Sequence, residues 1–155
     1  MSLEAKNLAV LDPLDEILQS AQEPSLDLLE RIVTGVCTRI SSRAESETFD
    51  RLIHFAKIGA WTDAALALIA LELPLWRVRR LDSENGEWHC ALSYQPNLPM
   101  DFDDCAQATH ELLSLAMLRA FVEACRRGRA MQTAVSIVPH IRPWSQQIMC
   151  CENYR

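Results

Sequence analysis

The sequence predicts an α+β fold: a mostly helical single domain that contains one antiparallel β-hairpin. Apolar residues recur at intervals of three and four over most of the chain, which is typical of amphipathic helices. Between about 75 and 94 the interval falls to two on both sides of a turn at Glu84-Asn85-Gly86, which is typical of a hairpin. A length of 155 residues fits one domain of ordinary size.

Four helices are predicted ahead of the hairpin, over about 12–19, 25–39, 48–58 and 62–73. The first begins at Asp12 with Pro13 in its first turn, where the missing N–H costs nothing. Ser25 is a typical N-cap for the second, and Gly59 is a typical stop for the third. The fourth contains an unbroken apolar run over 64–71, so we expect it to be buried on all sides.

The register of the hairpin follows from the length of its loop. A two-residue loop would place Trp76 and Val78 on the face opposite to the apolar residues of the second strand. A three-residue loop over 84–86, with Gly86 in the left-handed conformation, places them on the same face. We therefore expect a three-residue loop and a single apolar face, made of Trp76, Val78, Trp88, Cys90, Leu92 and Tyr94.

A long helix is predicted over about 102–127, with the hairpin packed on it. Asp101, Asp103 and Asp104 would complement the positive end of its dipole, and Gly128 would end it. Its apolar residues spread round more than one side, so a second element must also cover it.

The domain is expected to cover residues 1–128, followed by a C-terminal arm over 129–155 that is docked or partly disordered. The arm is too apolar for a purely solvated tail. Residues 133–138 favour a third strand that would complete the sheet. Otherwise the open edges of a two-stranded ribbon predict self-association, with a second copy completing the sheet.

Charge and hydropathy exclude several classes of partner. The net charge is −6 with a pI near 5.2, which disfavours nucleic acid. The longest apolar run, 64–71, is far too short to cross a bilayer, which takes roughly 20 residues. The N-terminus has no basic segment ahead of an apolar core, so we expect a cytoplasmic protein whose 6 cysteines stay reduced.

No motif indicates a catalytic residue, a cofactor or a metal site. His89, Cys90, Cys105 and His110 are ligand types for zinc, but His89 and Cys90 are neighbours on a strand and point to opposite faces. Cys105 stands near the predicted start of the long helix. There the helix dipole would lower the pKa of the thiol and the nearby aspartates would raise it. The sequence therefore favours a non-enzymatic protein over an enzyme.

The outer face of the hairpin carries a basic strip, made of Arg77, Arg79, His89 and Ser93. In an acidic protein such a strip can recruit an acidic peptide, a phosphate or a carboxylate, or it can be a solvated outer face. Together with Trp144 in the arm, these residues are the predicted contacts for a protein partner.

Two functions are compatible with these features. The first is a protein-interaction or regulatory module whose partner is another protein or a second copy of the chain, as a homodimer. The alternative is a small-molecule-binding protein or enzyme with a pocket between the hairpin and the helices. In that alternative His89, His110 or Cys105 would supply polar contacts.

The segments 76–78 and 86–92, Trp-Arg-Val and Gly-Glu-Trp-His-Cys-Ala-Leu, are followed by an alanine- and leucine-rich helix. Together they resemble small uncharacterised bacterial proteins built as helix, hairpin, helix. The resemblance covers about a third of the chain. It implies an α+β layering and a bacterial origin, and it transfers no functional residue.

Overall fold

The computed structural model describes residues 3–40 and 47–137. Within these ranges it contains five helices and a three-stranded antiparallel sheet of order β1-β2-β3, so the predicted α+β class is confirmed. The helices are α1 (Leu3–Ser20), α2 (Leu26–Val36), α3 (Glu47–Lys57), α4 (Trp61–Glu72) and α5 (Leu113–Ile137). The strands are β1 (Arg77–Glu84), β2 (Glu87–Ser93) and β3 (Ala106–His110), with a short 3-10 helix, η1 (Met100–Phe102), ahead of β3.

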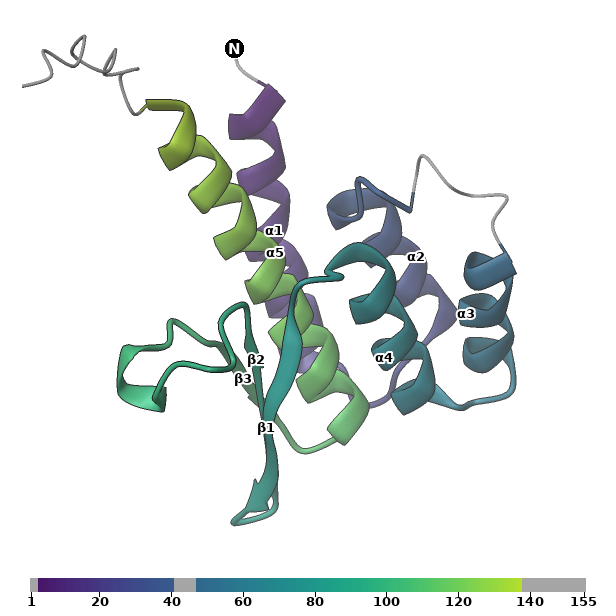
Figure 1. Cartoon of the computed structure of the whole chain (residues 1–155). Coiled ribbons are helices and arrows are strands. Elements are labelled where there is room, and N and C mark those ends of the chain that lie inside the picture. The colour runs from purple at the N-terminus through teal and green to yellow at the C-terminus, as the bar shows by residue number, and fades with distance from the viewer. Residues whose placement is uncertain (1–2, 41–46, 138–155) are drawn as a thin grey trace, which may run out of the picture.

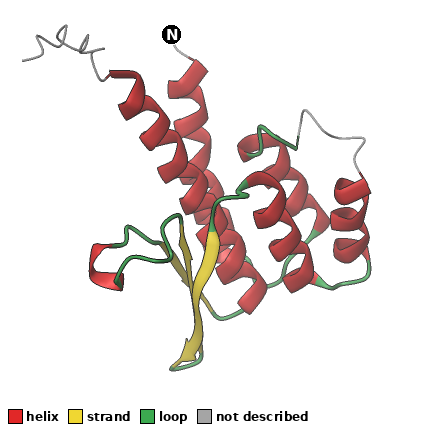
Figure 2. Cartoon of the chain, viewed as in Figure 1, coloured by secondary structure: helices red, strands yellow, loops and turns green. Residues whose placement is uncertain are grey.

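Helix α5 is the central element of the fold. It contacts α1, α4, β2 and β3, and helices α2 to α4 lie on one side of it while the sheet lies on the other (Figure 1). Leu115, Met117 and Phe121 on α5 are completely buried. The colouring by secondary structure shows the same division between helical and strand layers (Figure 2). The second covering element that the long helix requires is therefore a set of helices from the same chain.

The turn of the hairpin is shorter than predicted. Glu84 pairs with Glu87, so only Asn85 and Gly86 form the turn, with φ angles of 54° and 85°. Two left-handed residues in a two-residue loop make a type I′ turn, whose twist matches that of the strands. The prediction of a three-residue loop over 84–86 is wrong.

A β-bulge at Arg79 nevertheless preserves the predicted apolar face. The register shifts by one residue after Val78, so that Val78 pairs with Leu92. Trp76 lies against Tyr94, with ring centroids 5.9 Å apart. One inserted residue reverses the parity that a two-residue turn would impose on the rest of the strand. The six predicted apolar residues thus share a face, although Val78 and Tyr94 are exposed on it.

The third strand lies ahead of the long helix and not after it. In β3, Ala106 pairs with Leu92 and Ala108 pairs with Cys90, so both alanines join the face that packs on α5. Helix α5 begins at Leu113 and not near 102, because the aspartates before it belong to the loop between β2 and β3. Residues 133–137 are helical, so a strand there is also wrong.

Several helix boundaries differ from the predicted ones because of contacts with distant parts of the chain. Helix α1 begins at Leu3 and continues through Pro13, because packing on α2 and α5 offsets the hydrogen bond that proline removes. Gly128 does not end α5, which continues to Ile137. Gly59 does end α3: its φ is +77°, and the N–H groups of Gly59 and Ala60 close the helix.

Helix α4 is buried on one side only, which corrects the prediction that it is buried all round. Leu68 and Ile69 lie in the core, whereas Leu66 is exposed. The apolar residues of 64–71 therefore extend round more of the helix than the side that faces the core.

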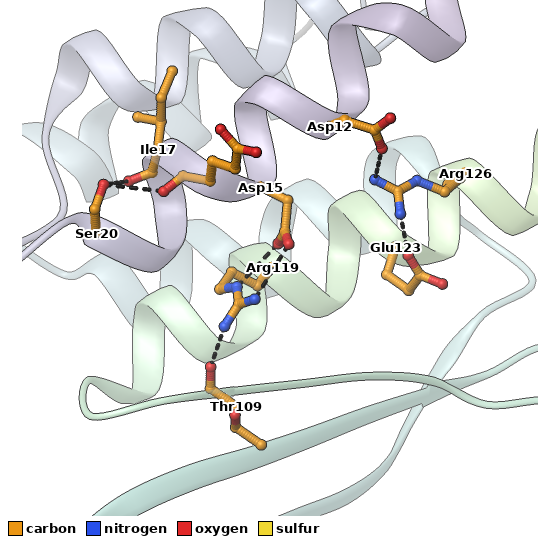
Figure 3. Close-up of polar contacts among 9 residues, drawn as sticks. Asp12, Asp15, Ile17, Ser20, Thr109, Arg119, Glu123 and Arg126 are labelled. Carbon is orange, nitrogen blue, oxygen red and sulfur yellow. Dashed lines mark hydrogen bonds and ion pairs between the residues drawn. The ribbon is translucent and has the colours of Figure 1, made fainter.

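Ion pairs attach α1 to α5. Arg119 binds both carboxylate oxygens of Asp15, at 3.0 and 3.2 Å, and donates to the carbonyl oxygen of Thr109 in β3 at 2.6 Å (Figure 3). Two turns further along α5, Arg126 binds Asp12 at 2.8 Å and Glu123 at 3.2 Å. Arg119 thus connects α1, α5 and the sheet edge. The third strand that the hairpin was expected to need is therefore β3 of the same chain, and β1 and β3 form the edges of the sheet.

Two glycine-to-alanine substitutions test the turn and the helix as a matched pair. Gly86→Ala places a Cβ at a φ of +85°, so we expect a loss of about 1–2 kcal/mol in the free energy of unfolding. Gly128 lies inside α5, and a Cβ added there meets no atom within 4 Å. We therefore expect Gly128→Ala to raise the free energy of unfolding by up to about 1 kcal/mol. Urea denaturation of both variants measures the difference. Equal effects from the two substitutions would contradict the assigned turn.

Candidate functional site

The loop between β2 and β3, residues 94–105, is held on the outer face of the sheet by a buried carboxylate. Asp103 Oδ2 accepts hydrogen bonds from Ser93 Oγ at 2.6 Å, from Cys105 Sγ at 3.1 Å and from the Arg79 guanidinium. Arg79 also donates to the carbonyl oxygen of Leu98. We call Arg79, Ser93, Asp103 and Cys105 the Asp103 clamp. It fixes the loop in its middle, at Leu98, and at its end, at Asp103 and Cys105.

The clamp is a structural assembly and not a reactive one. The hydroxyl of Ser93 has the largest effect on the pKa of Asp103 and lowers it, with Cys105 and Arg79 also lowering it against the effect of burial. Burial first, then the Asp103 carboxylate, raise the pKa of the Cys105 thiol to about 11. Cys105 is therefore a protonated donor near neutral pH and a poor nucleophile.

The clamped loop presents large apolar side chains to solvent. Phe102 is 78% exposed, and Leu98 and Met100 are also exposed. Two acids, Asp101 and Asp104, are exposed beside them, and Asp104 forms an ion pair with an arginine of α5. An exposed aromatic ring on a fixed loop is typical of a binding surface, since solvent exposure of the ring gives the fold nothing.

A second surface is an open cleft of about 610 Å³ between the ends of α2 and α4, the start of β1 and the middle of α5. Its apolar lining comes from Val36, Leu73, Leu75, Trp76, Tyr94 and Met131. Trp76 is buried, whereas Leu75 is 63% exposed and Met131 is 50% exposed. We call this surface the Trp76 cleft. Its volume lies within the roughly 300–1,000 Å³ range of small-molecule sites, and its rim is apolar and open.

Glu72, at the end of α4, shapes one wall of the cleft. Its carboxylate accepts hydrogen bonds from the backbone N–H groups of Thr38, Arg39 and Ile40 at 2.8 to 3.2 Å. Those N–H groups would otherwise continue α2, which explains why α2 ends at Val36 and not near Arg39 as predicted. Charge-assisted hydrogen bonds of this kind are about twice as strong as neutral ones.

Arginines surround the cleft. Arg39 and Arg129 line it, and Arg129 donates to the carbonyl oxygen of Val36 at 2.6 Å. Arg77 lies beside it and donates to the carbonyl oxygens of Pro74 and Trp76 at 2.7 and 3.0 Å. The lining of the cleft thus contains two arginines and one glutamate, and a third arginine is hydrogen-bonded to its backbone.

The thiols near the cleft are not reactive. Burial, and then the Glu72 carboxylate, raise the pKa of Cys125 to about 12, and the same causes raise the pKa of Cys37 further. Both thiols are therefore protonated near neutral pH and are poor nucleophiles.

The structure separates the residues of the predicted basic strip. Ser93 is completely buried and Arg79 is held by Asp103, so both support the loop. Arg77 lies beside the Trp76 cleft but does not line it, and His89 lies opposite Asp82 on the outer face. Trp144 lies outside the described residues.

The polar contacts expected for a pocket are also dispersed. His110 is on β3 and its Nδ1 accepts from the N–H of Leu112 at 2.9 Å. Cys105 precedes β3 and is not at the start of a helix, so the predicted dipole effect on its thiol does not apply. His89 and His110 are absent from the residues that line the Trp76 cleft.

Sequence reasoning missed Glu72, Asp103 and the exposed loop residues. Glu72 has a signal in retrospect, since it is a lone acid at the end of an apolar helix. Phe102 and Met100 have another, since large apolar residues stand between prolines and aspartates in a predicted loop. Arg39 and Arg129 gave no such signal because the helices that bring them together are far apart in the chain.

Replacing Glu72 tests its role at the cleft wall. Glu72→Gln replaces the charged carboxylate, which accepts hydrogen bonds from the backbone N–H groups of residues 38–40, with a neutral amide. We therefore expect a loss of about 1.5–3 kcal/mol in the free energy of unfolding. Urea denaturation measures this loss. The control is Glu30→Gln, which changes an exposed glutamate of α2 and should have little effect. Equal stability of the two variants would refute this role.

The Asp103 clamp makes the loop sensitive to acid. Because the folded-state pKa of Asp103 is lowered, its contribution is complete above the unfolded-state pKa and is lost as pH falls through the folded-state value. We expect residues 94–105 to exchange amide hydrogens faster in Asp103→Asn than in the native chain at neutral pH. Mass spectrometry of exchange in this segment measures it. Asp101→Asn, in the same loop but exposed, should leave the exchange unchanged, and equal rates in both variants would contradict the clamp.

Within the part of the chain that the structure describes, no group of three or more His, Cys, Asp or Glu side chains is placed to hold a metal ion. No helix among those residues has the length and apolar character that a bilayer span requires. Comparison with family models, with curated proteins and with solved structures found no match to this chain.

Proposed function

We propose that this chain is a non-enzymatic protein-interaction module of a bacterial cytoplasm, and that it holds an acidic, partly apolar segment of a partner protein in the Trp76 cleft. The observation that carries the proposal is the exposed apolar rim of the cleft beside Arg77. Leu75 and Met131 expose large side chains there, and the exposed Arg77 is hydrogen-bonded to the carbonyl oxygen of Pro74 in the lining. The bacterial setting is supported by the sequence resemblance alone.

The state of the polar groups favours binding over catalysis. The Glu72 carboxylate is occupied by three backbone N–H groups, so it is not placed to act as a general base. The thiols of Cys37 and Cys125 are held protonated. What the cleft offers a partner is apolar surface at its rim with Arg77 beside it, a combination by which grooves recognise amphipathic segments.

A small-molecule ligand is the second candidate. It is favoured by one observation, the cleft volume of about 610 Å³, which fits a small organic carboxylate. The open rim argues against it, because small-molecule sites usually enclose most of the surface of their ligand.

A displayed peptide library selected on the purified chain tests the proposal. We expect enriched peptides to combine Asp or Glu with Phe, Leu or Met. Met131→Glu should weaken these peptides about tenfold or more, since it places an acid in the rim. Arg77→Glu should weaken them several-fold, and less so at high salt. Fluorescence anisotropy of a labelled peptide measures both.

The matched control is Ile58→Glu, which adds the same charge at a residue that is 62% exposed between α3 and α4. It should bind the peptides as the native chain does. Enriched peptides that bind Met131→Glu equally well would refute the cleft as the site. Saturation of the cleft by a small carboxylate, with no peptide enriched, would favour the second candidate.

A further inference from the structure

Within the part of the chain that the structure describes, the apolar rim of the Trp76 cleft is left open. Trp76 is buried at the base of the cleft, whereas Leu75, Tyr94 and Met131 are exposed at its rim. Removing a large apolar side chain from water is worth roughly 1.5–3 kcal/mol. A segment that covers the rim is therefore stabilised by several side chains at once.

The described part of the chain ends close to this rim. Met131 lies on α5, which continues to Ile137, and residues 138–155 follow. The helix from Met131 to Ile137 is about 9 Å long. Trp144 follows Ile137 by seven residues, and that many extended residues span up to roughly 23 Å. The chain after Ile137 is therefore long enough to bring Trp144 back to the cleft.

Residues 138–155 have a composition that suits an apolar rim. Their large apolar side chains include Ile141, Trp144 and Ile148, which recur at intervals of three and four. Two arginines and one glutamate make the segment slightly basic, whereas the whole chain has a net charge of −6. Attraction between opposite charges thus favours contact between this segment and the rest of the chain.

We infer that residues 138–155 fold back onto the Trp76 cleft of their own chain, with Trp144 against the exposed side chains of Leu75 and Met131. There the segment competes with the partner of the proposed function, on which this regulatory role rests. The connection through α5 favours the contact, because a tethered segment acts at an effective concentration of the order of millimolar. The entropic cost of closing the loop grows only slowly with its length.

The loop that carries Phe102 is the other exposed apolar surface close to α5, since Asp104 in this loop pairs with Arg127 of the helix. The loop projects from the sheet (Figure 1). A ring that lies on such a projection keeps its far side in water. The cleft instead offers side chains from the ends of α2 and α4 and from α5, so it removes more of a ring from water. The shape of the two surfaces therefore favours the cleft.

Arg77 gives an acidic partner an advantage over the chain's own segment. Its guanidinium donates to the carbonyl oxygens of Pro74 and Trp76, which are neutral, so the arginine keeps its positive charge in these contacts. Glu152, the one acid among residues 138–155, follows Trp144 by eight residues. A partner with an acid beside its apolar residues binds both Arg77 and the rim. The segment thus covers the rim until such a partner displaces it.

Hydrogen exchange of the full chain, measured by mass spectrometry, tests where the segment lies. Trp144→Asp puts an acid into the apolar contact, so we expect residues 73–78 and 128–131 to exchange several-fold faster than in the native chain. Asn153→Asp adds the same charge to the segment but keeps Trp144, and it should exchange as the native chain does.

Two substitutions on the described fold test the other side of the contact. Met131→Glu should make residues 141–148 exchange several-fold faster, because it puts an acid into the rim. Ile58→Glu adds the same charge between α3 and α4 and should leave this exchange unchanged. Met131 and Ile58 are both exposed, and circular dichroism checks that each variant is folded.

Peptide binding measures the competition. The displayed library is selected on Trp144→Asp as well as on the native chain, and the affinity of each enriched peptide is measured for both. If the segment occupies the cleft in about nine molecules of ten, only the open tenth binds and the apparent affinity falls about tenfold. We therefore expect Trp144→Asp to bind the peptides about tenfold more tightly than the native chain and Asn153→Asp do.

Three outcomes of the exchange experiment would overturn the inference. One is equal exchange at residues 73–78 and 128–131 in the native chain and in Trp144→Asp. Another is a change confined to residues 94–105, which would place the segment on the loop around Phe102. The third is protection that rises with protein concentration, which would place the segment in a second copy of the chain.

The peptide measurement separates this inference from the proposed function. Peptides that bind the native chain and Trp144→Asp equally well would refute the competition and leave the proposed function intact. If no peptide is enriched on either chain although Trp144→Asp exchanges faster at the cleft, the proposed function is refuted and the fold-back contact stands.

Discussion

The extra residue at Arg79 is the constraint on which both surfaces of this molecule depend. With a two-residue turn, an unbroken ladder would pair Arg79 with Leu92 and carry Trp76 to the face away from α5. The bulge shifts the register once, so that Trp76 meets Tyr94 and becomes the buried base of the cleft. The same shift takes Arg79 out of the ladder, where its guanidinium reaches Asp103. A single insertion thus positions the cleft on one face and clamps the loop on the other.

Two buried carboxylates organise the irregular parts of the chain. Glu72 accepts the N–H groups that follow α2, and Asp103 accepts the donors at the base of the β2–β3 loop. In each case one acid satisfies several donors that no helix or strand pairs, which is the requirement that buried polar groups impose. Each surface is consequently held in shape by a carboxylate beneath it and exposes apolar side chains to solvent. That division is what the proposed binding role requires, because the two carboxylates are occupied in holding the backbone while the apolar groups at the rim stay exposed.

Local patterns in the sequence predict the fold class and most helices, whereas contacts between distant residues decide the rest. Ser25 and Gly59 mark real helix ends because capping is local. The end of α2 depends on Glu72, which follows Val36 at a long distance in the chain, so no local pattern contains it. The aspartates at 101, 103 and 104 have the composition of a helix start, but Arg79 and Ser93 draw Asp103 into a loop. The shared face of Trp76 and Trp88 is predicted for the wrong reason, because an odd loop and a bulge have the same effect on parity.

The size and charge of the two surfaces together determine what kind of contact they can form. A cleft of about 610 Å³ is of the size that holds a small ligand or a few side chains of a partner, and its rim is open where Leu75 and Met131 are exposed. The net charge of −6 repels acidic molecules over a distance that salt limits to roughly 8–10 Å. The acidic segment proposed above would therefore gain attraction only from contacts shorter than that length, such as a contact with Arg77. Because every other encounter with an acidic surface stays unfavourable, a local contact of this kind would make binding selective.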